Sequence, residues 1–229
     1  MSWSLRSVRL ALGPLATKFF TNSDMSTLET RIHLASQSPR RRELLTQVGV
    51  RFDLLLFRGG SRSDPETCED ALPGEAPEVY ALRVAMAKAR HGQKIQALRH
   101  LPQRIVLAAD TTLDLDGEII GKPRDDADAL EILRRLSGRT HRVLTAVAVA
   151  HQARIESRLS ISEVRFRALD EAEVRRYVAS GEPRDKAGAY GIQGRAAIFV
   201  AEIRGSHSGI VGLPLCETAL LLREFGYPI

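Results

Sequence analysis

The sequence of 229 residues has no long hydrophobic run, few aromatic residues and almost no cysteine. No apolar stretch approaches the ~18–20 residues of a membrane-spanning helix, so we expect no membrane partner. The two cysteines, Cys68 and Cys216, lie far apart without the spacing of a zinc site, and the six histidines form no paired ligand motif. We therefore expect a soluble, cytoplasmic protein of a reducing compartment, without structural zinc.

Aromatic residues make up only 5% of the chain, although its formal net charge is +5. The positive charge favours polyanionic partners, from nucleotides to nucleic acids. Proteins that bind single-stranded nucleic acid use aromatic stacking platforms, and the low aromatic content argues against such a partner. The chain also has no GxxxxGK[ST] segment, which excludes a P-loop nucleotide triphosphatase.

Residues 1–30 differ from the remainder of the chain. Their apolar residues are interrupted by charges such as Arg6 and Arg9 and show weak periodicity. They have some features of a targeting peptide, but no small-residue cleavage site is clear. We expect the chain to start at Met25, so that the first 24 residues are a misassigned or disordered segment. Residues 1–30 then form an N-terminal extension, disordered or with a misassigned start, and residues 31–229 a single domain.

Beyond the extension, strand-like and helix-like segments alternate, which predicts an α/β fold. A change of pattern in the longest predicted strand indicates a β-bulge near Ser162–Glu163. The predicted strands cover residues 32–35, 50–54, 105–109, 140–150, 155–167 and 196–200, and the predicted helices begin near residues 39, 77, 125, 170 and 215.

An arginine-rich turn joins the first predicted strand to the first helix. Ser38 is a suitable N-cap and Pro39 suits the first helical position, so Arg40 and Arg41 fall in the first turn. Arginines at this positive end of the helix dipole are unfavourable by ~0.3–1 kcal/mol each unless an anion is present. A bound phosphate would compensate, whereas an exposed arginine cluster on a solvated turn is the alternative.

Asp110 is the first candidate for catalysis. Residues 105–109 are apolar throughout, as in a central strand covered on both faces, and we expect Asp110 to end that strand. Ligands gather at the carboxyl ends of strands in α/β sheets; a role in capping a turn is the alternative. The Asp116–Gly117 pair predicts a type I′ hairpin turn that brings Lys122 near Asp110, where a plain salt bridge is the alternative.

Two further features complete the candidate site. Lys88 leaves a largely apolar face of the helix predicted at residues 77–98, although a lysine whose head reaches water is the alternative. Residues 184–194 hold three glycines, three charges and Gln193, which indicates a loop whose backbone approaches a ligand, or else a structured turn. Cations suit a polyphosphate, and a single carboxylate suits a base that activates water.

A series of motifs resembles the Maf family of nucleotide pyrophosphatases from Arg31 to Phe225. The motifs are Ser36-x-Ser38-Pro39-Arg40-Arg41, Ala109-Asp110-Thr111, Gly121-Lys122-Pro123, Leu136-Ser137-Gly138, residues 185–194 (DKAGAYGIQG) and Val211-Gly212-Leu213-Pro214. The resemblance implies a curved mixed sheet flanked by helices, as in inosine triphosphatase, with two lobes around a central cleft. It also implies a homodimeric house-cleaning enzyme that hydrolyses a nucleoside triphosphate to the monophosphate and pyrophosphate with a divalent cation (Mg, Mn or Co).

The resemblance assigns roles by position. Asp110 matches the proton acceptor of the family, and Ser36 lies in its arginine motif and is expected to bind substrate. The cations that face the phosphates in the family correspond to Arg41, Lys88 and Lys122. The family positions linked to base selection correspond to Arg40, Thr111 and Gln193. Asp-Thr and Ala-Tyr-Gly-Ile-Gln resemble the branch that acts on dTTP and UTP, and modified pyrimidine nucleotides are further candidate substrates. A 7-methyl-GTP or other modified-nucleotide pyrophosphatase, or a regulator of septum formation, is the alternative.

The chain departs from the family pattern in one place. Family members usually carry an acidic pair shortly after the second strand, and the aligned positions here are Gly60-Ser61. Asp64 or Glu66 would have to take that role after a shift of the loop. The resemblance therefore leaves the metal ligands unknown.

Overall fold

The computed structural model describes residues 31–57 and 69–229. The predicted extension and the positions Gly60-Ser61, Asp64 and Glu66 lie outside these residues. The strands are β1 (Ile32–Leu34), β2 (Phe52–Leu54), β3 (Val106–Leu115), β4 (Glu118–Ile120), β5 (Thr140–His151), β6 (Arg154–Phe166) and β7 (Val200–Arg204). The α-helices are α1 (Pro39–Gln47), α2 (Pro77–Leu98), α3 (Asp126–Leu136), α4 (Glu171–Ala179), α5 (His207–Val211) and α6 (Leu215–Glu224).

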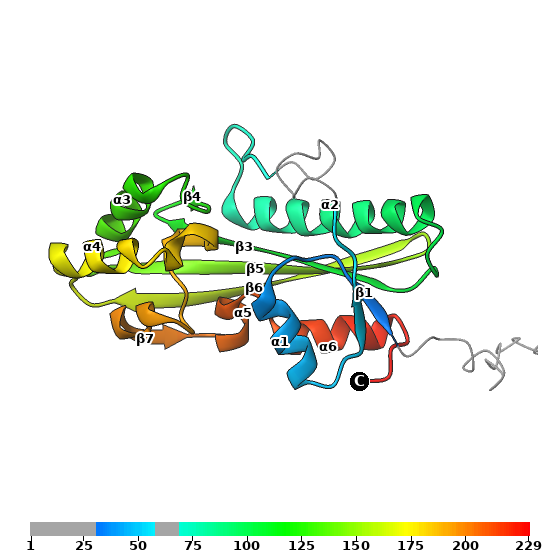
Figure 1. Ribbon diagram of the computed structural model, residues 1–229. Coiled ribbons are helices and arrows are strands. Elements are labelled where there is room, and N and C mark those ends of the chain that lie inside the picture. The colour runs from blue at the N-terminus through cyan, green and yellow to red at the C-terminus, as the bar shows by residue number, and fades with distance from the viewer. Residues whose placement is uncertain (1–30, 58–68) are drawn as a thin grey trace, which may run out of the picture.

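The described strands form one mixed sheet in the order β2-β1-β3-β5-β6-β7, with β4 paired to β3. β1 runs parallel to both its neighbours, and the remaining pairs are antiparallel. Figure 1 shows β3, β5 and β6 running along the length of the molecule, with α2 on one side of them and α1 and α6 on the other. The predicted mixed sheet flanked by helices is confirmed. None of the described helices is both long enough and apolar enough to cross a membrane.

The two faces of the sheet are covered by different side chains, because successive residues of a strand point to opposite faces. Under α2 the contacts are mostly between alanines, which let the helix approach the sheet closely. Under α1 and α6 they are between leucines and valines. The α2 face includes Ala81, Ala85, Ala89, Ala108, Ala146 and Ala148, and the opposite face includes Leu44, Leu45, Leu107, Val147, Leu221 and Leu222.

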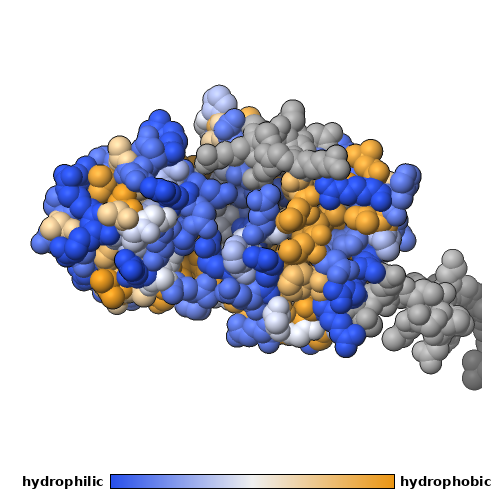
Figure 2. Space-filling view, in the orientation of Figure 1, coloured by the Kyte–Doolittle hydropathy of each residue, from blue (hydrophilic) through white to orange (hydrophobic). Residues whose placement is uncertain are grey.

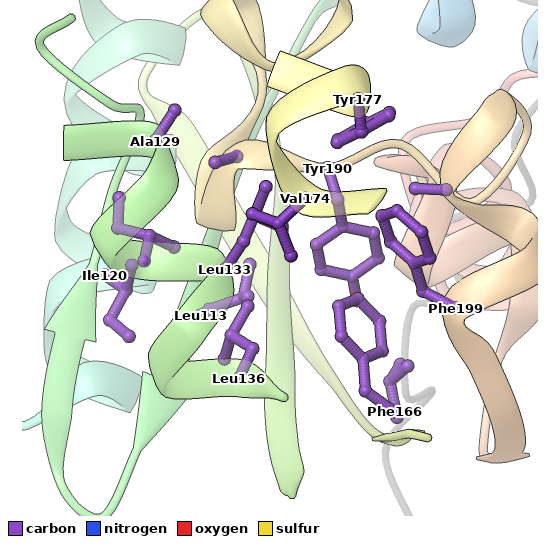
Figure 3. Packing of buried hydrophobic residues seen from close by; sticks show 14 of the residues in the cluster. Leu113, Ile120, Ala129, Leu133, Leu136, Phe166, Val174, Tyr177, Tyr190 and Phe199 are labelled. Atoms are coloured by element: carbon purple, nitrogen blue, oxygen red, sulfur yellow. The ribbon is translucent and has the colours of Figure 1, made fainter. Parts of the chain in front are cut away.

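A third core lies at the far end of the long strands, beneath α3 and α4. Figure 3 shows the rings of Tyr190, Phe166 and Phe199 gathered beside Leu133 and Leu136. The Tyr190 and Phe166 rings are 4.8 Å apart and meet edge to face. Tyr190 belongs to the glycine-rich loop, so this core anchors that loop to the sheet.

The surface also differs between the two ends. In the view of Figure 2 hydrophilic side chains predominate around α3 and α4, whereas hydrophobic ones gather near β1, β2 and α2. Leu54 and Leu56, in and just after the edge strand β2, are both exposed.

The elements agree with the sequence prediction at several positions. α2 begins and ends at the expected residues, Pro77 and Leu98. Asp116 and Gly117 both have positive φ, of 57° and 88°, as a type I′ turn requires. Asp125 caps α3 by accepting a hydrogen bond from the backbone N–H of Asp128. Local patterns were sufficient in these places because each depends on residues close in the chain.

Three predictions about the strands were wrong. Asp110 does not end a strand: β3 continues to Leu115, because its second half pairs with β5 and buries leucines in the far core. The β5–β6 register runs unbroken past Ser162–Glu163, and the irregularity lies instead between β6 and β7, near Phe166. Residues Arg195–Phe199 form a 3₁₀ turn that precedes β7, since Ala196 and Phe199, three residues apart, are both buried.

His141 is expected to make the stability of the fold depend on pH. Its side chain is 2% exposed, its Nε2 lies 2.8 Å from the hydroxyl of Tyr190, and burial lowers its pKa from 6.5 to about 4. Between these values the unfolded chain binds the proton and the native state does not, so stability falls as pH falls from 6.5 to 4. The loss should reach about 3 kcal/mol at the acid end of that range.

Urea unfolding of the wild type and His141→Gln between pH 7 and 4 measures this effect. The variant should lose less stability on acidification than the wild type, whereas His207→Gln, at an exposed histidine, should follow the wild type. Parallel curves for the wild type and His141→Gln would contradict the prediction.

Candidate active site

A cavity of about 340 Å³ lies between the arginine turn, the middle of β3, the hairpin, the glycine-rich loop and α5. Every site residue predicted from the sequence lines it. These residues are Ser36, Arg40, Arg41, Lys88, Asp110, Thr111, Lys122 and Gln193. The elements that supply them are far apart in the chain, so the mixed sheet is what brings them together.

Asp110 and Lys88 form a buried ion pair in this cavity. Asp110 points to the α2 face of the sheet, as Ala108 does two residues before it. The Nζ of Lys88 lies 2.7 Å from Oδ1 of Asp110, and both residues are 7% exposed. The predicted inward position of Lys88 is confirmed, and the alternative in which its head reaches bulk water is wrong.

Glu69 also reaches this ion pair, and the sequence analysis missed it. Its Oε1 lies 2.7 Å from Nζ of Lys88, and its Oε2 lies 3.9 Å from Nζ of Lys122. The hydroxyl of Tyr80 donates a hydrogen bond of 2.8 Å to the backbone carbonyl of Glu69, which ties this segment to α2.

Arg41 is held in one orientation by three hydrogen bonds. Its Nε donates to the carbonyl of Gly212 at 2.8 Å, and its two terminal nitrogens donate to the hydroxyls of Ser36 and Thr111 at 3.2 Å each. Burial lowers the pKa of its guanidinium. An exposed, purely solvated arginine is therefore excluded at this position.

The start of α1 lies at Ser38 and Pro39, as predicted, but not with the predicted cap. The side chain of Ser38 makes no capping hydrogen bond. Instead its backbone N–H donates to the hydroxyl of Ser36 at 3.2 Å, which forms the turn. The backbone N–H groups of the first helical turn therefore stay available to an anion in the cavity.

The hairpin and the glycine-rich loop meet at the cavity. The N–H of Gly188 donates to the carbonyl of Gly121 at 2.9 Å, next to Lys122. Gly188 has φ of +69°, and a Cβ there would overlap the side chain of Leu113, so only glycine fits this contact. Burial lowers the pKa of the Lys122 ammonium, while the carboxylate of Glu69 opposes that shift. An additional anion would favour the charged form further.

The remaining walls differ in polarity. Arg40 pairs with Asp185 at 3.6 Å, which joins α1 to the glycine-rich loop. Gln193 lines the cavity from the same loop. Apolar side chains also line it, from Leu113, Val143, Ile192 and Ile210. A cavity that combines clustered cations with apolar walls and the amides of Gln37 and Gln193 suits a ligand with both phosphates and a base.

A divalent cation would find few protein ligands here. The described residues contain no group of three or more His, Cys, Asp or Glu side chains that could hold a metal ion. Mg²⁺ is commonly bound by only one or two carboxylates together with substrate phosphates, however. Glu69 and Asp110, which contact the same ammonium of Lys88, fit that type of site.

Comparison with known proteins gives consistent results. A family model described as Maf-like protein matches residues 31–225. The dTTP/UTP pyrophosphatase of Aromatoleum aromaticum is 62% identical over 206 residues, which cover 90% of this chain and 100% of that protein. The dTTP/UTP pyrophosphatase of Dechloromonas aromatica is 61% identical over 197 residues, covering 86% and 98%. Among solved structures, the Ham1 protein of Staphylococcus aureus matches at 14% identity and a TM-score of 0.39, over 59% of this chain and 71% of that one, too weakly to carry an argument.

Proposed function

The chain belongs to the Maf family, and from this premise we propose that it is a nucleoside triphosphate pyrophosphatase that hydrolyses dTTP and UTP to the monophosphate and pyrophosphate. The observation that carries the proposal is the cavity itself, in which the Asp110 carboxylate lies among Arg41, Lys88 and Lys122 beside apolar walls. A house-cleaning role, the removal of such nucleotides or of modified pyrimidine nucleotides, is part of the proposal. So are a homodimer and a cytoplasmic location.

Asp110 is the proposed base. It accepts a proton from a water molecule whose oxygen attacks the α-phosphorus in line with the leaving group. The new bond joins the water oxygen to the α-phosphorus, and the broken bond is the one from that phosphorus to the oxygen of pyrophosphate, which departs with the electron pair. Lys88, 2.7 Å from Asp110, keeps the carboxylate oriented.

Arg41 and Lys122 are the proposed phosphate ligands. Partial burial lowers the pKa of both cations, although Arg41 is only half-buried and the Lys122 side chain is 43% exposed, so a polyphosphate would offset their desolvation. In the transition state they stabilise negative charge on the departing pyrophosphate. A divalent cation held by Glu69, Asp110 and the phosphates would supply further charge neutralisation.

Release of pyrophosphate across a panel of nucleotides tests the proposal. dTTP and UTP should be hydrolysed with kcat/KM at least about tenfold above dCTP, CTP, the purine triphosphates and 7-methyl-GTP. Preferential hydrolysis of 7-methyl-GTP would show that the substrate is this nucleotide and not dTTP or UTP. If no nucleotide released pyrophosphate, the proposed enzyme activity would be wrong.

Gln193 is the proposed contact to the base. A glutamine amide offers one donor group and one acceptor, which matches the mixed donor and acceptor edge of uracil and thymine. Gln193→Ala should lower kcat/KM for dTTP and UTP about tenfold and change the low activity toward purine nucleotides much less. Gln47→Ala, at an exposed glutamine on α1, serves as the control. An equal loss for all nucleotides would show that Gln193 does not select the base.

A further inference from the structure

Thr145 is a buried hydroxyl between valines. It lies on β5, opposite Thr111 in the β3–β5 register, and is fully buried. Val143 and Val147, two residues away on either side and on the same face of the strand, are apolar core residues. A valine of similar shape would complete this row without a polar group. A buried hydroxyl costs free energy unless it is hydrogen bonded, so its partners indicate why it is there.

The first partner of the Thr145 hydroxyl is the side chain of Thr111, which also contacts Arg41. The hydroxyl of Thr145 lies 3.0 Å from the hydroxyl of Thr111. That same Thr111 oxygen accepts a hydrogen bond of 3.2 Å from a terminal nitrogen of Arg41. Thr145 does not line the cavity, whereas Thr111 and Arg41 do. Thr145 therefore holds the Thr111 hydroxyl in place for Arg41 from outside the cavity.

The second partner of the Thr145 hydroxyl is the backbone of Gly209, which is connected to Arg41 through Gly212. The hydroxyl of Thr145 donates to the carbonyl of Gly209 in α5 at 2.8 Å. The N–H of Gly212 in turn donates to the carbonyl of Gly209 at 3.0 Å, and the carbonyl of Gly212 accepts from Nε of Arg41. A Cβ on Gly209 would lie 3.0 Å from the hydroxyl of Ser160, so α5 rests close against the sheet here.

We propose that Thr145 is a positioning residue that fixes the Arg41 guanidinium in the phosphate end of the cavity. One hydroxyl contacts both segments that orient the arginine, the Thr111 side chain and the α5 backbone. This inference rests on the proposed function in one respect, namely that Arg41 binds phosphate. Thr145 itself touches no substrate, and its effect on anion binding passes through Arg41.

Thr145→Val removes the hydroxyl and keeps the shape. Calorimetry with inorganic pyrophosphate and Mg²⁺ should give about tenfold weaker binding than for the wild type, because the guanidinium loses its fixed orientation. Thr145→Ser, which keeps the hydroxyl, should bind within about twofold of the wild type. Thr218→Val is the matched control: Thr218 is also buried, but its hydroxyl donates to the backbone carbonyl of Pro214, the N-cap residue of α6. It should leave pyrophosphate binding unchanged.

A double-mutant cycle separates positioning from general loss of structure. In an Arg41→Gln background, Thr145→Val should weaken pyrophosphate binding by less than about twofold. The proposal is overturned if Thr145→Val binds like the wild type, if Thr145→Ser is as impaired as Thr145→Val, or if the full effect persists without Arg41. Should Thr145→Val not fold, Thr145→Cys, with its weaker donor, takes its place in the same cycle.

The same measurements distinguish failure of this inference from failure of the proposed function. A wild type that binds pyrophosphate but releases none from dTTP would reject the function, while the cycle would still report on Thr145. A wild type that does not bind pyrophosphate would overturn the inference.

Discussion

Asp110→Asn is expected to lower kcat for dTTP and UTP by about 10³-fold while the protein stays folded. An amide of the same shape cannot take the proton from water, so the chemical step loses its base. The fold should persist because Lys88, which pairs with Asp110, keeps its second carboxylate partner, Glu69. Single-turnover release of pyrophosphate measures the first effect, and circular dichroism with thermal unfolding measures the second.

Asp114 offers a matched control on the same strand and the same face. It is 4% exposed, it pairs with Arg142, and it accepts a hydrogen bond from the N–H of Gly117 at the hairpin turn. Asp114→Asn should lower stability and leave turnover within about threefold of the wild type, since Asp114 lies outside the cavity lining. If Asp110→Asn retained wild-type turnover, Asp110 would not be the base.

Glu69→Gln is expected to lower kcat/KM about 100-fold at low Mg²⁺ and to raise the Mg²⁺ concentration needed for half-maximal activity. The amide is a weaker ligand for a hard cation than the carboxylate. The neutral amide also no longer balances the ammonium groups of Lys88 and Lys122, which lie 2.7 and 3.9 Å from the carboxylate oxygens of Glu69. Turnover measured across a Mg²⁺ titration separates the weaker cation binding from the loss of charge balance at the lysines. Excess Mg²⁺ should restore the activity lost through weaker cation binding but not the activity lost through the lysines.

Glu75 lies in the same segment and controls for its packing. Its side chain is 4% exposed and pairs with Arg83 at 2.6 Å, away from the cavity. Glu75→Gln should destabilise the protein without moving the midpoint of the Mg²⁺ titration. A Glu69→Gln variant with the wild-type midpoint and wild-type turnover would show that Glu69 neither binds the cation nor balances the lysines.

Local sequence patterns predicted the parts of the fold that depend on local interactions. α2 was predicted to run from Pro77 to about Leu98 because Pro77 suits the first helical position and apolar residues recur at helical spacing after it, although Val79, expected on the inner face, is 56% exposed. The hairpin was predicted because Asp-Gly is the pair that most readily takes two positive φ angles. The candidate site residues were identified from motifs far apart in the chain, and the mixed sheet brings those motifs together in one cavity.

The features that the sequence did not predict depend on contacts between segments that are distant in the chain. Asp110-Thr111-Thr112 resembles the end of a strand, yet β5 supplies the ladder partners Ala146, Thr145 and Leu144 that keep β3 extended. No pattern within β3 indicates which strand will pair with it. Glu69 was missed for the same reason: its position depends on contacts with Lys88 and Tyr80, and nothing periodic surrounds it.

The long strands also determine how the protein loses its structure. β3 and β5 supply side chains to the core under α2, to the core under α1 and α6, and to the core at the far end. Each core packs on strands that the other two cores share, so we expect the three cores to unfold together. Asp110 lies in the middle of this ladder, opposite Ala146, so its backbone is released only when the strand pairs on both sides of it separate. The carboxylate proposed as the base therefore keeps its position among the cations until the sheet itself unfolds.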